Sequence, residues 1–334
     1  MSKLKEFITN ILSSSTADSS FTIGKKIMLL GGGGAAITLV LGLVGIFSLT
    51  QINTNADKLA NVYLPEWDIA ADIEKNVRLA GNGILRYNQN YNDDYWQEVS
   101  SYFTSIDQGI QRARDLEAQY DLPALRERLG DIEDASAEYQ ESAVVYYNAT
   151  RELVNYREQS DASNGDFQSS MEEFLEVYNE NLSSMISAGT GNARVDRARD
   201  QISEVEDLIQ GLNSAMAAVW RAEALNDVAT LNTIEAMFVE YRNEMGELYD
   251  SINDPELEMF LGIGLGALND NVTNVRSMIE AKNIVLREEE TREAAFDEIL
   301  KNTTALNEIS QNESYSQAEQ TQGVVASFIW ILSL

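Results

Sequence analysis

The stretch NVRLAGNGILRY, residues 76–87, places Arg78, Asn82 and Arg86 at intervals of four. If this stretch is helical, each step of four turns about 400°, so the three side chains form one polar stripe. Arginine binds carboxylates through two parallel hydrogen bonds and keeps its charge, which makes it suited to recognising organic acids. Such a stripe is unusual in a chain with only 24 Lys and Arg against 54 Asp and Glu, and it is the first candidate binding site.

A second polar stretch, LREEETREA at residues 286–294, interrupts the apolar pattern of a late helix and contributes Arg287, Thr291 and Arg292. Counted along helices from the two apolar segments near the chain ends, Arg78 and Arg292 lie about 28 and about 30 residues away, at the same level. Tyr139 on a third helix passes that level by the same count. We expect these residues to surround one carboxylate ligand.

The alternative interpretation is that these arginines are surface residues. Glu74, Glu293 and the acidic run 288–290 could pair with them on a solvated surface, where such pairs contribute little to stability. A weaker second cluster in the outer half of the helical region has the same two interpretations, a carboxylate pocket or a core Trp with solvated arginines; it consists of Arg157, Trp220, Arg221 and Arg276.

Composition limits the chemistry. The chain has no His and no Cys, which removes imidazole and thiolate catalysis and the commonest metal ligands. The formal charge of −30 argues against nucleic acid as a partner. No phosphate-binding loop, catalytic triad or metal motif is present, so we expect a binding protein without cofactor or metal rather than an enzyme.

Residues 27–49 carry no charge and are long enough to span a bilayer. Lys25 and Lys26 precede this segment, so the positive-inside rule places residues 1–26 in the cytoplasm and residues from about 50 onward outside. The apolar residues 323–334 are too short to span. We interpret them as the start of a second membrane helix cut partway, with a buried helix end as the alternative.

The region 50–322 is predicted to be helical throughout, because proline is scarce and apolar residues recur at steps of three and four. Pro65 is expected to bend the first helix, and DASNGD (161–166) to kink the third without ending it. The expected helices are 50–90, 93–120, 122–188, 192–226, 229–252 and 254–322. Their lengths predict an all-α fold of two stacked four-helix bundles that share two long helices, flanked by transmembrane helices.

This layout resembles the N-terminal part of a bacterial methyl-accepting chemotaxis receptor with a helical bimodular periplasmic sensor domain. The closest local likeness is VYLPEWDIAADIEKNVRLAGNGILRY, residues 62–87, which is similar to the first helix of such receptors. The resemblance implies an inner-membrane homodimer that binds small ligands, often organic acids, in the periplasm. It also implies a signal carried by displacement of the last helix to cytoplasmic signalling proteins through a C-terminal region absent from this sequence.

Two alternatives remain open from the sequence. Some sensor histidine kinases carry the same outer domain, so the C-terminal region would distinguish a kinase from a chemoreceptor. The outer domain could instead be a module that docks a periplasmic binding protein and takes no small molecule itself.

Overall fold

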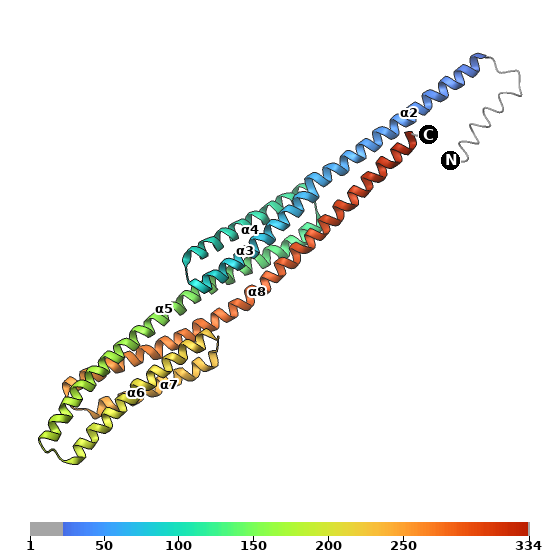
Figure 1. Ribbon diagram of the computed structural model, residues 1–334. Coiled ribbons are helices and arrows are strands. Elements are labelled where there is room, and N and C mark those ends of the chain that lie inside the picture. Colours follow the sequence, from blue (N-terminus) through green and yellow to red (C-terminus); the bar gives the residue numbers. More distant parts are fainter. Residues whose placement is uncertain (1–22, 333–334) are drawn as a thin grey trace. The chain divides into compact units, whose positions relative to one another are not determined.

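The structure is a computed structural model that describes residues 23–332. All the elements in this range are helices, with no strand (Figure 1). In chain order they are α2 (Ile23–Lys58), the π-helical turn η1 (Leu59–Tyr63), α3 (Leu64–Asn90), α4 (Asp93–Tyr120), α5 (Pro123–Ser187), α6 (Asn192–Ala224), α7 (Val228–Ser251) and α8 (Pro255–Leu332). The predicted all-α fold is confirmed. Most of the expected cytoplasmic segment, residues 1–22 of 1–26, lies outside the described residues.

The helix ends follow the turn chemistry of the sequence. Asp254 accepts a hydrogen bond from the backbone N–H of Glu256 at 3.0 Å, and α8 begins at Pro255, whose missing N–H costs nothing at the first helical position. Asp227 caps α7 in the same way, accepting from the backbone N–H of Thr230 at 3.0 Å. The expected helix starts at these two places are therefore confirmed.

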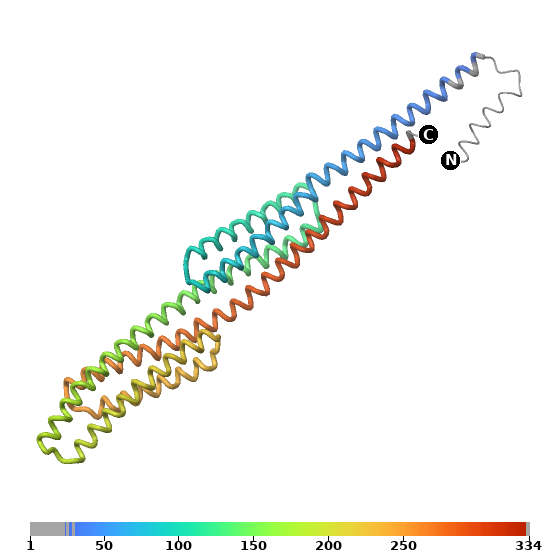
Figure 2. Tube along the Cα trace, in the orientation of Figure 1, coloured from blue at the N-terminus to red at the C-terminus, as the bar shows by residue number. Residues whose placement is uncertain are grey.

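The two long helices are continuous. The helix α5 covers 65 residues and remains helical through 161–166, where the sequence predicted a kink that does not end the helix. The helix α8 covers 78 residues. Figure 2 lets the reader follow each of them as an uninterrupted coil.

The π-helical turn η1 lies directly before Pro65, where the sequence predicted a bend. The backbone N–H of Leu64 donates to the carbonyl of Leu59, five residues back, which is the π-helical pattern. Proline has no N–H, and its ring would clash with the carbonyl four residues earlier in an ideal helix. A turn with one extra residue removes that conflict and lets the helix continue into α3.

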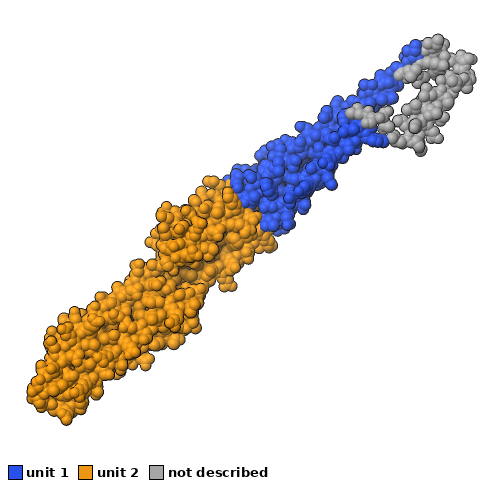
Figure 3. Space-filling model, in the orientation of Figure 1, with its two compact units in different colours: residues 1–72, 111–128, 303–334 blue, residues 73–110, 129–302 orange. Residues whose placement is uncertain are grey.

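The chain divides into two compact units, and one of them holds all the candidate site residues (Figure 3). This unit consists of Ile73–Ile110 and Leu129–Asn302. In it, α3 and α4 pack with the first part of α5 and the middle of α8, and α6 and α7 pack with the remaining parts of α5 and α8. Two stacked four-helix bundles thus share α5 and α8, as predicted.

Side-chain contacts join the helices within each of the two bundles. In the first, the ring of Tyr139 on α5 lies 5.9 Å from that of Phe103 on α4 and 6.2 Å from that of Phe296 on α8. In the second, the Ser170 hydroxyl on α5 donates to the Phe260 carbonyl on α8 at 2.7 Å. Each shared helix therefore contributes to both cores.

The other unit consists of Met1–Asp72, Gln111–Arg128 and Thr303–Leu334. Here α2 contacts the end of α8, where the Asn55 amide donates to the Thr321 hydroxyl at 3.3 Å. The buried core of this unit includes Val62 in η1 and Ile69 in α3, while Glu66 between them is a buried carboxyl.

The apolar start of this unit contains the one helix in the described range that is long and apolar enough to cross a membrane, within the stretch Gly31–Asn90. Its large apolar side chains are exposed, among them Ile37, Leu39, Val40 and Leu43. The expected second membrane segment, 323–334, is helical as far as Leu332; residues 333–334 lie outside the described residues.

Candidate functional site

A cleft of about 460 Å³ opens between α3, α5 and α8. Four of the side chains that the sequence singled out line it: Arg78 and Asn82 from α3, Tyr139 from α5 and Arg292 from α8. The cleft also has lining residues that sequence reasoning did not place there, namely Gly81, Leu85, Glu289, Glu293, Phe296 and Asp297. Polar groups from three helices converge there beside the aromatic rings of Tyr139 and Phe296.

Gly81 makes room for the cleft. A Cβ atom at this position would lie 3.5 Å from the Tyr139 hydroxyl and 3.8 Å from the Phe296 ring. Those are ordinary contact distances, so a methyl group would fit, but it would fill space directly in front of the Tyr139 hydroxyl. The small residue on α3 therefore leaves the space beside that buried hydroxyl unfilled.

Arg292 lines this cleft and forms no ion pair with a described carboxylate. Its guanidinium lies over the Tyr146 ring, with Cζ 4.5 Å from the ring centroid. Its Nη1 atom is buried and has no hydrogen-bond acceptor, and no carboxylate among the described residues lies within ion-pair distance of it. A buried donor without an acceptor is costly, so this atom is suited to receive one from a ligand.

Tyr139 presents a second unpartnered group to the same cleft. Its side chain is 1% exposed, and its hydroxyl has no hydrogen-bond partner in the protein. Burial raises the pKa of Tyr139 to about 12, and the nearby Arg292 charge opposes this only partly. The phenol therefore keeps its proton at neutral pH and can donate it to an anion.

Arg78, by contrast, already has a carboxylate. Its Nη2 and Nε atoms lie 2.9 and 3.1 Å from one oxygen of Glu74, four residues earlier on α3. The side chain is 54% exposed. Its contacts match the surface interpretation of the sequence, even though it also lines the cleft.

Three further residues of the predicted site do not line this cleft. Arg86 lines a neighbouring cleft of about 380 Å³ between α3 and α4, together with Asn82, Glu98 and Tyr102. Arg287 pairs with Glu288 at 2.8 Å and is 66% exposed. Thr291 is half-buried outside the cleft. Counting residues predicts height along a helix but not direction around it, and Arg287 lies about 140° around α8 from Arg292.

The second predicted cluster is only partly assembled. The guanidinium of Arg157 lies 5.1 Å from the Trp220 ring centroid and 3.8 Å from Glu223. Arg276 is bound by Glu235 at 2.7 Å, and Arg221 is exposed. Arg157 and Arg276 therefore each lie beside a glutamate.

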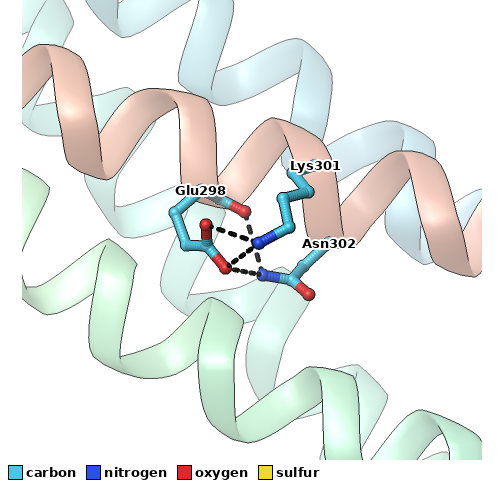
Figure 4. A network of polar contacts seen from close by, with 3 residues as sticks. All are labelled: Glu298, Lys301 and Asn302. Carbon is cyan, nitrogen blue, oxygen red and sulfur yellow. Dashed lines mark hydrogen bonds and ion pairs between the residues drawn. The ribbon is translucent and has the colours of Figure 1, made fainter.

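Glu289 and Glu293 were missed as site residues because the sequence interpretation treated them as solvating partners of the arginines, and Asp297 was not singled out at all. Glu289, Glu293 and Asp297 recur every four residues on α8, a spacing that places them on one face. The next acid, Glu298, belongs to a separate network on α8 with Lys301 and Asn302 (Figure 4). Lys301 Nζ lies 2.9 Å from both oxygens of Glu298, so this acid is neutralised locally.

No protein-family model matches the chain, and no curated protein matches it either. Among solved structures, one chain similar to it comes from the crystal structure of the TorS sensor domain–TorT complex in the presence of TMAO. The identity is 11%, the TM-score is 0.43, and the alignment covers 75% of this chain and 99% of that chain. What this chain binds is therefore inferred from its own side chains.

Proposed function

We propose that this chain is the sensing part of a bacterial inner-membrane chemoreceptor that binds a small organic acid in the cleft between α3, α5 and α8. The observation that carries the proposal is the pair of unpartnered groups in that cleft, the buried Nη1 of Arg292 and the buried hydroxyl of Tyr139. Both are hydrogen-bond donors, and one is charged. A carboxylate is the common ligand group that accepts from both.

The proposed binding mode assigns a role to each side chain. Arg292 donates to the carboxylate, and Tyr139 donates a further hydrogen bond to it. The Tyr146 ring beneath the guanidinium holds its plane in place, because arginine stacks favourably on aromatic faces. The Asn82 amide at the cleft edge orients the remainder of the ligand. All of these side chains have binding roles and none activates a nucleophile. We therefore propose a receptor and not an enzyme.

The proposed signal is a displacement of α8. Arg292 lies on this helix, which is one continuous element from Pro255 to Leu332. A ligand that bridges Arg292 to residues on α3 and α5 would change the position of α8 relative to those helices. In the proposed homodimer, that displacement passes through the membrane to cytoplasmic signalling proteins. The apolar start of α2 is the proposed membrane anchor, which places the helical domain in the periplasm.

The choice of chemoreceptor over sensor histidine kinase is supported by the likeness of residues 62–87 to the first helix of such receptors. Expression of the complete gene in a motile bacterium tests it. We expect swimming behaviour and receptor methylation to respond to the ligand, whereas a kinase would instead phosphorylate a response regulator.

Binding itself is tested by isothermal titration calorimetry on the whole chain in detergent, with a panel of monocarboxylic, dicarboxylic and amino acids. Hydrogen bonds to charged groups contribute about 1.5–3 kcal/mol, so Arg292→Ala should weaken binding roughly tenfold to hundredfold. Arg287→Ala, which removes a paired arginine from the same helix outside the cleft, should leave affinity unchanged. If the wild-type chain binds no member of the panel, the proposal is wrong, and a module that docks a binding protein becomes the better explanation.

A further inference from the structure

The cleft that contains Arg292 and Tyr139 also contains an excess of carboxylates. Glu289, Glu293 and Asp297 line it from α8. All three side chains are exposed to solvent, and none of them forms an ion pair or a hydrogen bond with another described residue. These acids are therefore available to a ligand.

The charge balance at the cleft does not suit a ligand that is only negative. Three carboxylates and two guanidiniums line it, and one of those guanidiniums, Arg78, is already bound by Glu74. Arg292 is therefore the lining cation that no carboxylate among the described residues holds, and three carboxylates line the same cleft. A second carboxylate on the ligand would be repelled wherever it came near this face of α8, because like charges in close contact disfavour each other.

A metal ion would be one way to use the three acids. However, no group of three or more acidic side chains in the described range is placed to hold a metal ion. The acids lie on successive turns and are spread over about 12 Å along α8, which is too far to converge on one cation. A ligand with its own positive group needs only two acids one turn apart, which this row provides.

We infer that the ligand is a zwitterion, a small amino acid whose carboxylate binds Arg292 and Tyr139 and whose ammonium group binds two neighbouring carboxylates of the row on α8, those of Glu293 and Asp297. This inference rests on the proposed function and names the ligand class of the same cleft. The buried, unpartnered hydroxyl of Tyr139 defines the carboxylate end. The rings of Tyr139 and Phe296 supply aromatic faces beside the acids, and such faces also attract ammonium groups.

The geometry limits how far apart the two charges of the ligand are. Along α8, Arg292 lies about 4.5 Å in axial rise from Glu289 and about 7.5 Å from Asp297. The ammonium must therefore lie within a few bonds of the carboxylate. Amino acids with the amine on the second to the fourth carbon, where the carboxyl carbon is the first, satisfy this condition.

The test compares amino acids with the same acids lacking the amine. The whole chain in detergent is titrated by calorimetry with L-alanine against propanoate, 3-aminopropanoate against propanoate, and 4-aminobutanoate against butanoate, followed by the remaining natural amino acids and their deaminated partners. We expect at least one amino acid to bind ten times or more as tightly as its partner. Glu293→Gln and Asp297→Asn should reduce that ratio by threefold or more.

The matched control is Glu290→Gln, which removes the same charge from the same helix at an exposed residue that does not line the cleft. It should leave the ratio unchanged. Thermal melting of each variant checks that the fold is retained, which is expected because all of these acids are exposed. If deaminated acids bind as tightly as the amino acids, or if Glu290→Gln changes the ratio as much as Glu293→Gln, the zwitterion inference is overturned and carboxylate sensing stands. If no compound in the panel binds, the proposed function fails as well.

Discussion

The guanidinium of Arg292 on α8 lies over the ring of Tyr146 on α5, with 4.5 Å between Cζ and the ring centroid. The Tyr146 hydroxyl in turn accepts a hydrogen bond from the Asn88 amide on α3. Three helices thus fix the plane of one charged group, which leaves the buried Nη1 with no freedom to reach solvent by itself. Preorganised charge of this kind is what a binding site for an anion requires, because little ordering remains to be done when the ligand arrives.

Replacing Tyr139 by Phe should separate stability from binding. The hydroxyl has no partner in the protein, so its removal should leave the free energy of unfolding unchanged or raise it by up to about 1 kcal/mol. Affinity for the ligand should fall about tenfold or more, because a hydrogen bond to a carboxylate is lost. Thermal melting and calorimetry on the same preparation measure both quantities.

Tyr146→Phe is the contrasting variant. It removes a hydroxyl that does have a partner, Asn88, so it should lower stability by about 1 kcal/mol. A Tyr139→Phe protein that is less stable than wild type, with unchanged affinity, would assign Tyr139 to the core and remove it from the site.

Arg78→Ala should have a smaller effect than the sequence suggested. The stripe of Arg78, Asn82 and Arg86 by itself predicts that Arg78 binds the ligand and that its loss reduces affinity roughly tenfold to a hundredfold or more. In the structure Glu74 holds this exposed guanidinium, and an exposed pair of this kind contributes under about 1 kcal/mol to stability. We now expect affinity to fall by less than about fivefold, well below the effect of Arg292→Ala.

Calorimetry on the two alanine variants with the same ligand ranks them. If Arg78→Ala weakens binding as much as Arg292→Ala, then the Glu74 pair opens on binding and the original interpretation of the stripe is the better one.

The fold was predictable because the signals that end helices are local. Asp254 and Pro255 specify a helix start by themselves, and three- and four-residue spacing identifies the buried face, for example at Ile73 and Val77. The level of the site along the bundle was predictable too, because rise per residue is constant. The direction of each side chain around its helix was harder, since the π-helical turn η1 shifts the register before α3.

The sequence also left undecided which of the cleft arginines forms an ion pair with a neighbouring acid. Glu74 lies four residues before Arg78, and Glu293 lies next to Arg292, so both arginines have acidic neighbours in the sequence. Of these two arginines, Arg78 forms an ion pair among the described residues and Arg292 does not. Which arginine stays free depends on packing from another helix, here the Tyr146 ring on α5, and no local pattern contains that information.

The buried carboxyl of Glu66 predicts a dependence of stability on pH. Burial raises the pKa of Glu66 above its ordinary value of 4.5, the nearby Ser310 hydroxyl lowers it in part, and the negative charge of Glu313 raises it further. Below about pH 4.5 the group is protonated in both states and adds no cost. As pH rises from there through the raised pKa, the unfolded chain gives up its proton first, so stability is lost and then stays lower at neutral pH.

Glu66→Gln should remove this dependence. Its melting temperature at neutral pH should exceed that of wild type, and the difference should shrink toward pH 4. Asp68→Asn, at an exposed acid on the same helix, serves as the control and should show no such convergence. Parallel melting curves for wild type and Glu66→Gln from pH 4 to 8 would show that burial does not perturb Glu66.

Two glycines on one turn of α3, Gly81 and Gly83, allow ligand binding and core packing to be perturbed separately. A Cβ at Gly81 would meet the Tyr139 hydroxyl at 3.5 Å, an ordinary contact, while a Cβ at Gly83 would lie 2.6 Å from the Val99 Cγ2 atom on α4. Valine is stiff at its first side-chain torsion and cannot swing away, so Gly83→Ala should strain the α3–α4 packing by about 1–3 kcal/mol.

Gly81→Ala should do the opposite. Alanine favours a helix interior over glycine by about 0.5–1 kcal/mol, so the protein should become slightly more stable. The added methyl group lies in front of the Tyr139 hydroxyl, however, and should weaken ligand binding by about fivefold or more, since it displaces the carboxylate from its donor. Melting temperature and dissociation constant should therefore move in opposite senses at Gly81, whereas at Gly83 stability should fall with little change in affinity. Equal affinities for Gly81→Ala and wild type would mean that the ligand does not approach Tyr139, and the carboxylate would then have to bind elsewhere in the bundle.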